Sequence, residues 1–435
     1  MYGLTRQRPS VKSAVGVSVL LIVLLAFPVW AQERTLTFMH CWDAHRTAWV
    51  DEMLDSFEAA HPGVKVERQL VVCGMLRDNF MTAYLGGAAP DVVMIHSLDI
   101  PALVESGVFV PLDDYLKADG ISMDTWYPSE IGTAVWQDRL YGLPIRTGGD
   151  TNSVFYYNRT LFAEVGLNPD DPPATWDEWL EAAQRLTRYE EDRLVRAGTA
   201  LYGGDFSEVA YLATAGGRLI SEDGRRVAFT DEAGIAAAQF TYDLGARTYR
   251  GHWHELYELT GGDDTAAFLD GRLAMHTGGI LSHSFYVTNA PELDFAIAVR
   301  PSREPGGPSG ANAGTFHWAI ARGSSDEALA WELVKWVALR EDTGGLFMLR
   351  QGRPSPVRAF NDNPAYFETN PYWLVVGEAL ARAVTLPSYP FTRDVMNIFG
   401  GAVGSVAWGD QAAVPALEQA AAQAQALIDE YWQGR

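Results

Sequence analysis

The chain offers few groupings of side chains that could perform catalysis. It lacks the G-x-S-x-G, H-E-x-x-H and strand-following G-x-G-x-x-G patterns of serine hydrolases, zinc proteases and dinucleotide-binding proteins. Asp113-Asp114 and Asp263-Asp264 could supply the two carboxylates of a glycoside hydrolase, but adjacent acids are typical of solvated loops. His252–Glu255 holds two imidazoles without further metal ligands at a recognisable spacing. We therefore predict no catalytic residue, no metal and no cofactor.

Polar residues follow two of the predicted strands near the start of the chain. The residue pattern predicts a strand over 34–42, an amphipathic helix over 45–60 and a second strand over 64–72. Such a βαβ unit makes its strands parallel, and 89–96 is typical of a third, buried parallel strand. Ligands of open α/β sheets bind outside the carboxyl ends of the strands. That rule selects Trp42, Asp43, His96, Ser97 and Asp99.

A sugar presents flat apolar faces surrounded by hydroxyl groups. A sugar site therefore needs aromatic rings together with charged or amide side chains. Aromatic residues make up 12% of the chain, and most of them must lie in the core. Trp42, Phe206 and Trp253 stand beside glycines or polar residues in predicted loops, so they are candidates for stacking on a sugar.

The two cysteines, Cys41 and Cys73, lie at the carboxyl ends of the first two predicted strands. Adjacent parallel strands would bring them within range of a disulfide, which an exported protein can form in an oxidising compartment. Two separate thiols are the alternative. Two cysteines alone do not indicate a metal site.

Length and charge limit the class of protein. A chain of 435 residues exceeds what one hydrophobic core normally supports, so we expect two lobes. The formal net charge is −22, which argues against nucleic acid and anionic membrane surfaces as partners.

Residues 1–31 are typical of a secretory signal peptide. Arg6, Arg8 and Lys12 precede an apolar run over 15–29, and Ala31 ends a small-residue cleavage site. A retained membrane anchor is the alternative, although the run is short for a spanning helix. Because no cysteine follows the cleavage point, we expect a freely diffusing periplasmic protein and not a lipoprotein.

The segment 141–186 carries a family resemblance. Its sequence includes YYNRTLF, a proline-rich loop and PPATWDEW, in which Thr175 and Glu178 have the spacing of a helix capping box. This arrangement resembles family 1 extracellular solute-binding proteins, the maltose-binding-protein-like periplasmic receptors of sugar ABC importers. APDVV (89–93), FLDGRLAMHTGGI (268–280) and QGRPSP (351–356) also resemble family segments.

The resemblance implies the type II periplasmic-binding-protein fold, in which two α/β lobes enclose a ligand cleft. By analogy with the family's chain crossings, we expect an N-terminal lobe from 32–146 and 309–355 and a C-terminal lobe from 147–308 and 356–435.

The resemblance also adds candidate ligand-binding positions, although each could equally be an ordinary surface or ion-pairing residue. They are Arg146 and Asp150 in the hinge segment, Gly279 and His283 after the paired glycines, Arg353 in QGRPS, and Arg393 and Asn397 in the helix after Phe391. The family commonly has a small or acidic residue at the position of Arg146, which leaves the identity of the ligand open.

The predicted function is a monomeric, non-enzymatic receptor that delivers a carbohydrate to a membrane ABC permease. In this interpretation Asp43, Asp99, Asp150 and Asn397 bind sugar hydroxyls. One alternative is a receptor for an anionic solute such as glycerol phosphate, held by Arg146, Arg353 and Arg393. A second alternative is a secreted glycoside-active enzyme, which would need two facing carboxylates.

Overall fold

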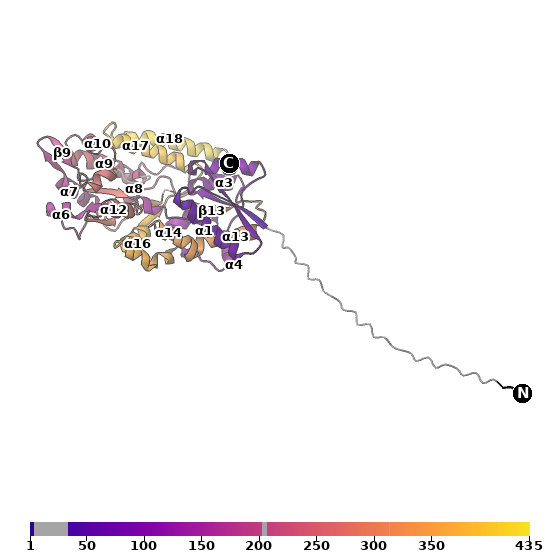
Figure 1. The fold of residues 1–435 in the computed structure, drawn as a ribbon. Helices are drawn as coiled ribbons and strands as arrows, with labels where there is room; N and C mark the ends of the chain where they lie inside the picture. The colour runs from indigo at the N-terminus through magenta and orange to yellow at the C-terminus, as the bar shows by residue number, and fades with distance from the viewer. Residues whose placement is uncertain (4–33, 202–206, 313) are drawn as a thin grey trace.

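The computed structural model describes residues 1–3, 34–201, 207–312 and 314–435. Figure 1 shows two α/β lobes side by side, the first built mainly from the N-terminal segments and the second mainly from the middle and C-terminal segments. Among the described residues, no helix is long and apolar enough to cross a membrane.

The first lobe is organised around a five-stranded sheet with the order β2-β1-β3-β13-β6. Its strands are β1 (Arg34–His40), β2 (Val64–Leu70), β3 (Val92–His96), β6 (Leu143–Pro144) and β13 (Phe316–Ile320). Its helices are α1 (His45–Ala60), α2 (Leu76–Leu85), α3 (Ile100–Glu105), α4 (Asp113–Ala118), α5 (Pro128–Ile131), α13 (Glu327–Leu339) and α14 (Leu346–Arg350). The small pair β4 (Val135–Trp136) and β5 (Arg139–Leu140) lies apart from this sheet.

The predicted βαβ unit is confirmed. β1 pairs in parallel with β2 and with β3, whereas β13 runs antiparallel to β3. The crossover helix α1 buries an apolar stripe that includes Met53, Leu54 and Phe57. Because β13 is antiparallel, its first residue, Phe316, lies opposite His96 at the carboxyl end of β3.

The second lobe contains a three-stranded antiparallel sheet covered by helices. The sheet order is β10-β7-β11, formed by β10 (Met275–Gly278), β7 (Val154–Asn158) and β11 (Phe295–Val299). Two further strand pairs are β8 (Arg188–Glu190) with β9 (Arg193–Arg196), and β12 (Gly310–Asn312) with β14 (Ala383–Thr385).

The helices of this lobe are α6 (Arg159–Glu164), α7 (Trp176–Leu186), α8 (Ser207–Thr214), α9 (Glu232–Thr248), α10 (Trp253–Thr260), α11 (Asp264–Leu269), α12 (Ser282–Asn289), α15 (Pro364–Thr369), α16 (Trp373–Arg382), α17 (Thr392–Ala407) and α18 (Ala413–Gln433). The predicted capping box is present at the start of α7.

Buried apolar side chains form two clusters. One takes residues between 36 and 145 together with 318–357, and the other takes residues between 154 and 311 together with 366–428, plus Leu98 and Tyr127. β12 packs with the second cluster through Ala311, a few residues beyond the crossing that the sequence predicts near 309.

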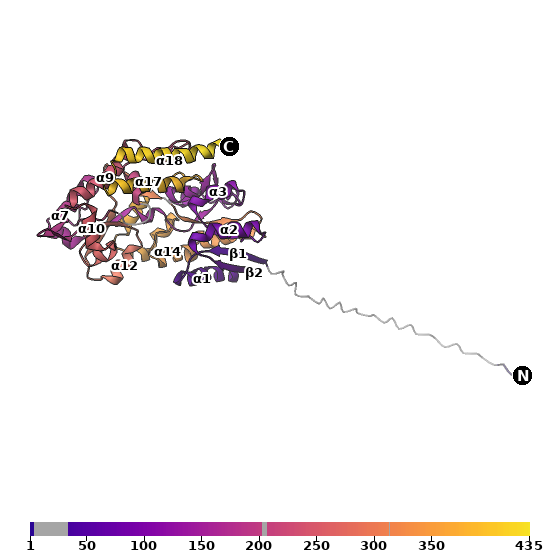
Figure 2. The ribbon, with the colours of Figure 1, turned by 90° about the horizontal axis from the view of Figure 1, so that it is seen from above.

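The last helix joins the two lobes. α18 packs along α17 in the second lobe and ends beside α3 of the first lobe, as Figures 1 and 2 show from two directions. There Tyr431 and Arg435 both contact the carboxylate of Glu105.

Candidate functional site

His96 is the last residue of β3, and its ring lies where the two lobes meet. Its Nδ1 accepts a hydrogen bond from the backbone N–H of Leu98 at 3.2 Å. Nη2 of Arg393, from α17 of the second lobe, lies 3.3 Å from the same nitrogen. Burial, together with the charges of Arg393 and Arg146, lowers the pKa of His96 to about 3. The ring is therefore neutral near pH 7, with Nδ1 accepting and Nε2 carrying the proton.

Asp99 places a carboxylate beside this ring. Nη2 of Arg393 lies 3.6 Å from Oδ2 of Asp99, and Nη1 of Arg77, from α2, lies 3.8 Å from Oδ1. Burial raises the pKa of Asp99, while the two guanidinium groups oppose the shift. The Asp99 carboxylate is thus paired with one guanidinium group from each lobe.

Phe316 provides an aromatic surface next to these polar groups. Its ring meets the His96 ring edge to face at a centroid distance of 5.2 Å, and Cζ of Arg146 lies 5.7 Å from its centroid. Phe316 is only partly buried against the first core cluster. The arrangement combines a ring face, a carboxylate, a neutral imidazole and guanidinium groups from both lobes. We call these residues the interlobe cluster; they are Arg77, His96, Asp99, Arg146, Phe316 and Arg393.

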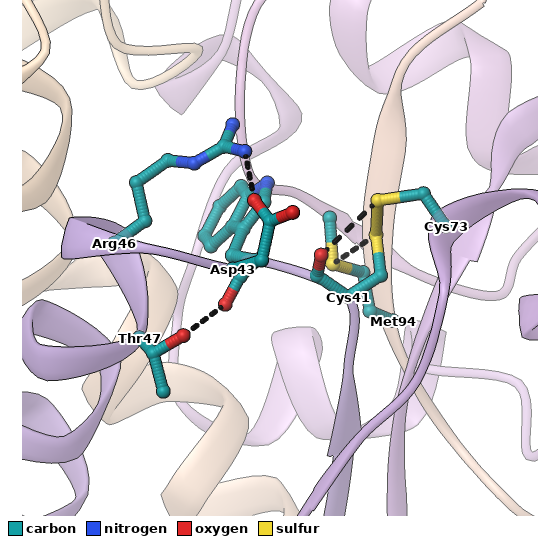
Figure 3. Close-up of a disulfide and its surroundings, with 7 residues drawn as sticks. Cys41, Asp43, Arg46, Thr47, Cys73 and Met94 are labelled. Atoms are coloured by element: carbon teal, nitrogen blue, oxygen red, sulfur yellow. Dashed lines mark hydrogen bonds and ion pairs between the residues drawn. A yellow bond between two sulfur atoms is a disulfide. The ribbon is translucent and has the colours of Figure 1, made fainter.

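The disulfide lies at the same edge of the first sheet. Cys41, which follows β1, is bonded to Cys73, which follows β2, as Figure 3 shows. The predicted disulfide is therefore confirmed. The Cys41 sulfur also lies 3.9 Å from Sδ of Met94 in β3. The bridge thereby joins the carboxyl ends of β1 and β2, and of the cluster residues Arg77 follows it most directly, in α2.

Trp42 and Asp43 both adjoin the disulfide, but only Asp43 is exposed. The Trp42 ring is 3% exposed and stacks on Phe347 at a centroid distance of 4.2 Å. It is a core residue, so its predicted stacking on a sugar is not supported by its position. Asp43 is exposed and pairs with Arg46 at 2.7 Å (Figure 3), and this pairing lowers its pKa.

Arg353, Gly279 and His283 lie in segments that approach each other from the two lobes. A Cβ on Gly352 would lie 2.6 Å from Oγ of Ser284 in α12, so the turn before Arg353 contacts the helix that carries His283. The Gly279 carbonyl accepts a hydrogen bond from Tyr156 Oη at 2.9 Å. His283 is 4% exposed, and burial lowers its pKa.

Two of the predicted binding residues are placed elsewhere, and two cannot be described. Trp253 begins α10 instead of lying in a loop; its ring is 1% exposed and its Nε1 donates to the Thr241 carbonyl at 3.1 Å. It is thus a core residue and offers no face to a sugar. Asn397 is exposed on α17 and lines a groove against α18 with Gln411. Phe206 lies outside the described residues, as does the side chain of Asp150.

Sequence reasoning missed Arg77 and Phe316. Phe316 could have been found had β13 been recognised from the sequence as a strand antiparallel to β3, because its first residue then lies at the ligand-binding edge. Arg77 carries no local signal, since a cation on a short helix is ordinarily a solvated residue. No group of three metal-ligating side chains forms within the described part of the chain.

Comparison with known proteins identifies the family. A profile of the bacterial extracellular solute-binding protein family matches residues 43–343. The chain belongs to this family. The resemblance predicted from segment 141–186 is thereby confirmed.

Individual relatives agree with this assignment. A binding protein of Brucella abortus (strain 2308) is 25% identical over 419 residues, which cover 94% of this chain and 96% of that protein. The sn-glycerol-3-phosphate-binding periplasmic protein UgpB of Escherichia coli (strain K12) is 25% identical over 156 residues, 35% of each chain.

A solved structure, that of the sugar-binding protein MalE from Xanthomonas citri, matches with a TM-score of 0.80 and 17% identity over 92% of this chain and 98% of that one. The chain therefore has the type II periplasmic-binding-protein fold, as predicted. The family and these relatives are binding proteins.

Proposed function

We propose that this solute-binding protein captures a carbohydrate at the interlobe cluster and delivers it to a membrane ABC permease. The observation that carries the proposal is the meeting of Phe316, Asp99 and Arg393 at the junction of the lobes. A partly exposed ring suits an apolar sugar face, and the carboxylate and guanidinium groups suit hydroxyls. Closure of the lobes around such a ligand would exclude water and present a changed shape to the permease.

The remaining parts of this function have separate support. The two buried clusters support the proposed lobes, 32–146 with 309–355 and 147–308 with 356–435, except near the crossings, where Ala311 packs with the second cluster and Val357 with the first. Residues 1–31 would be a cleaved signal peptide, and the mature protein a periplasmic monomer that is not a lipoprotein. The chain would have no catalytic activity, because the family to which it belongs is one of binding proteins.

An anionic solute is the second candidate ligand. The charges of Arg393 and Arg146 both act on His96 and lower its pKa, and part of the chain is similar to a glycerol-phosphate-binding protein. Against this candidate, the carboxylate of Asp99 compensates Arg393 at 3.6 Å and would repel an anion. The carbohydrate proposal rests instead on the partly exposed Phe316 ring beside Asp99, since a sugar can offer an apolar face to the ring and hydroxyls to the carboxylate.

The test is titration calorimetry of the purified protein against a panel of mono- and oligosaccharides and sn-glycerol 3-phosphate. We expect one sugar to bind with a dissociation constant below millimolar. Phe316→Ala should weaken the binding of that sugar ~5- to 150-fold, because burying a large apolar side chain contributes about 1–3 kcal/mol. Phe367→Ala is the matched control, because Phe367 is 42% exposed on α15 away from the cluster.

Three results would contradict the proposal. If only the phosphate binds, and its affinity falls steeply with salt, the solute is anionic. If Phe316→Ala binds the sugar as tightly as Phe367→Ala does, the ligand lies elsewhere. If the sugar is recovered chemically changed after incubation, the protein is an enzyme.

A further inference from the structure

A buried carboxylate holds together the segments that join the two lobes. Glu130, in α5 of the first lobe, is 0% exposed. Its Oε2 accepts from the backbone N–H of Gly148 at 2.7 Å, and its Oε1 accepts from the N–H of Gly149 at 3.2 Å. Nδ2 of Asn312 donates to the same Oε2 at 2.8 Å. Gly148 and Gly149 lie in the first crossing between the lobes, and Asn312 lies in the second.

Asn312 connects this carboxylate to the second lobe. It is the last residue of β12, which pairs with β14, and its neighbour Ala311 is buried in the second core cluster. Asn312 Nδ2 also donates to the Ser129 carbonyl at 2.9 Å, and its Oδ1 accepts from Gly314 N–H at 3.1 Å. Relative movement of the lobes would therefore act directly on the Glu130–Asn312 hydrogen bond.

The packing around Gly148 shows how closely the two crossings approach. A Cβ at Gly148 would lie 2.1 Å from Asn312 Oδ1 and 2.8 Å from the Gly314 carbonyl oxygen. Two side-chain hydrogen bonds add to this contact: Thr315 Oγ1 donates to the Arg146 carbonyl at 2.6 Å, and Thr147 Oγ1 donates to the Pro354 carbonyl at 3.3 Å. The first crossing is thus hydrogen-bonded both to the second crossing, through Thr315, and to the segment at Pro354, where the proposed third crossing begins.

We propose that Glu130 is a positioning residue of the hinge. It holds the first two crossings as one unit and so determines which separation of the lobes the empty protein prefers. Charge-assisted hydrogen bonds to a buried carboxylate are stronger than neutral ones. The hydrogen bonds described above join Glu130 to the hinge segments. Ligand affinity then depends on Glu130 through the fraction of molecules in the binding-competent arrangement.

The first experiment needs no ligand. Cysteines introduced at Leu85 on α2 and Leu374 on α16 can carry spin labels, because these side chains are 79% and 76% exposed. Pulsed electron paramagnetic resonance between the two labels then reports the separation of the lobes. The native cysteines are both in the disulfide, so they do not take up label. Glu130→Gln keeps the shape of the side chain but removes its charge and one acceptor. We expect this substitution to shift or broaden the distance distribution. The ratio of the two lobe arrangements should change by roughly tenfold or more, because that factor corresponds to the free energy of one charge-assisted hydrogen bond.

Asp91→Asn is the matched control. Asp91 is a buried carboxylate of the first lobe that likewise accepts from backbone amides, those of Thr37 at 2.8 Å and Ser325 at 2.7 Å, but it lies away from the crossings. Both substitutions should lower the melting temperature, whereas only Glu130→Gln should change the distances. Glu130→Asp, which restores the charge, should return part of the wild-type distribution.

The proposal is overturned if Glu130→Gln melts earlier but gives the wild-type distance distribution, since Glu130 then serves stability alone. If Glu130→Gln does not fold, Asn312→Ala breaks the same bond from the other side and should shift the distances in its place. Hydrogen exchange of the unmodified protein is decisive in either case: rapid, unprotected exchange of the Gly148 and Gly149 amides would refute the proposal.

This inference extends the proposed function but can fail separately from it. Once calorimetry has identified a sugar, Glu130→Gln should change its apparent affinity by the factor that the distances give. A panel in which no sugar binds refutes the proposed function, yet it leaves the distance and exchange measurements able to support or reject the role of Glu130.

Discussion

Loss of the Cys41–Cys73 disulfide should destabilise the first lobe by about 3–4 kcal/mol. The bridge joins residues separated by 32 positions, and the chain-entropy model gives roughly 3–4 kcal/mol at 25 °C for a loop of that length. Cys73 is exposed, so Cys73→Ala removes the cross-link without opening a cavity. Cys41 is 2% exposed and contacts Met94, so its replacement would add a loss of packing.

The assay is guanidinium unfolding followed by tryptophan fluorescence, to which Trp42 and Trp318 in the first core contribute. The transition of the first lobe should move to lower denaturant in Cys73→Ala and, to the same extent, in wild-type protein treated with dithiothreitol. Dithiothreitol should leave Cys73→Ala unchanged, which controls for effects of the reductant.

One result would refute this reasoning about the unfolded state. If oxidised wild type and Cys73→Ala unfold at the same midpoint with equal slopes, closing the loop does not restrict the unfolded chain by the expected amount. A change of slope without a change of midpoint would instead indicate residual structure in the unfolded first lobe.

Two further predictions concern the stability of each lobe. Thr175→Ala should destabilise the second lobe by about 1 kcal/mol, because Thr175 Oγ1 caps α7 by accepting from the Glu178 N–H at 3.3 Å. Thr175→Ser should unfold like wild type in urea, and equal midpoints for both variants would contradict the role of the cap. His276 and His317 are buried, and burial lowers their pKa values to about 4 and about 3. In the unfolded chain they take up protons near pH 6.5. The stability that the two neutral imidazoles contribute at neutral pH should therefore be lost as the pH falls from 6.5 to about 4 for His276 and to about 3 for His317. A urea midpoint that does not change between pH 7 and 4.5 would contradict this prediction.

Local patterns in the sequence predicted the elements of the fold well. The apolar stripe of 45–60 corresponds to α1, and the spacing of Thr175 and Glu178 corresponds to the observed capping box. The disulfide followed from the positions of Cys41 and Cys73 at the ends of parallel strands. These features depend on neighbours in sequence or on one strand pairing, so periodicity and turn signals suffice to find them.

The aromatic candidates show where sequence reasoning was insufficient. Polar and glycine neighbours suggested that Trp42 and Trp253 lie in open loops. In the structure Trp42 stacks on Phe347, about three hundred positions later in the chain, and Trp253 packs against Gly245 of α9. Neighbouring residue types reveal neither the distant partner of Trp42 nor the packing of Trp253 against the helix that precedes it. Phe316, which no loop signal marks, is the ring that remains partly exposed beside the polar cluster.

The bonds across the lobe junction have the same long-range origin. His96 meets Arg393 across 297 positions, and Glu130 meets Asn312 across 182. The first contact belongs to the candidate site, whereas the second belongs to the hinge, and α5 and β3 place both on the first lobe's side of the junction. Because ligand affinity scales with the population of the competent lobe arrangement, substitutions at either contact can alter binding. Substitutions at the cluster should also alter which solute is chosen, since the proposed ligand would contact its side chains. If Glu130 acts through the hinge as proposed, a variant such as Glu130→Gln should change the affinity for every solute of a panel by one common factor and leave the selectivity unchanged.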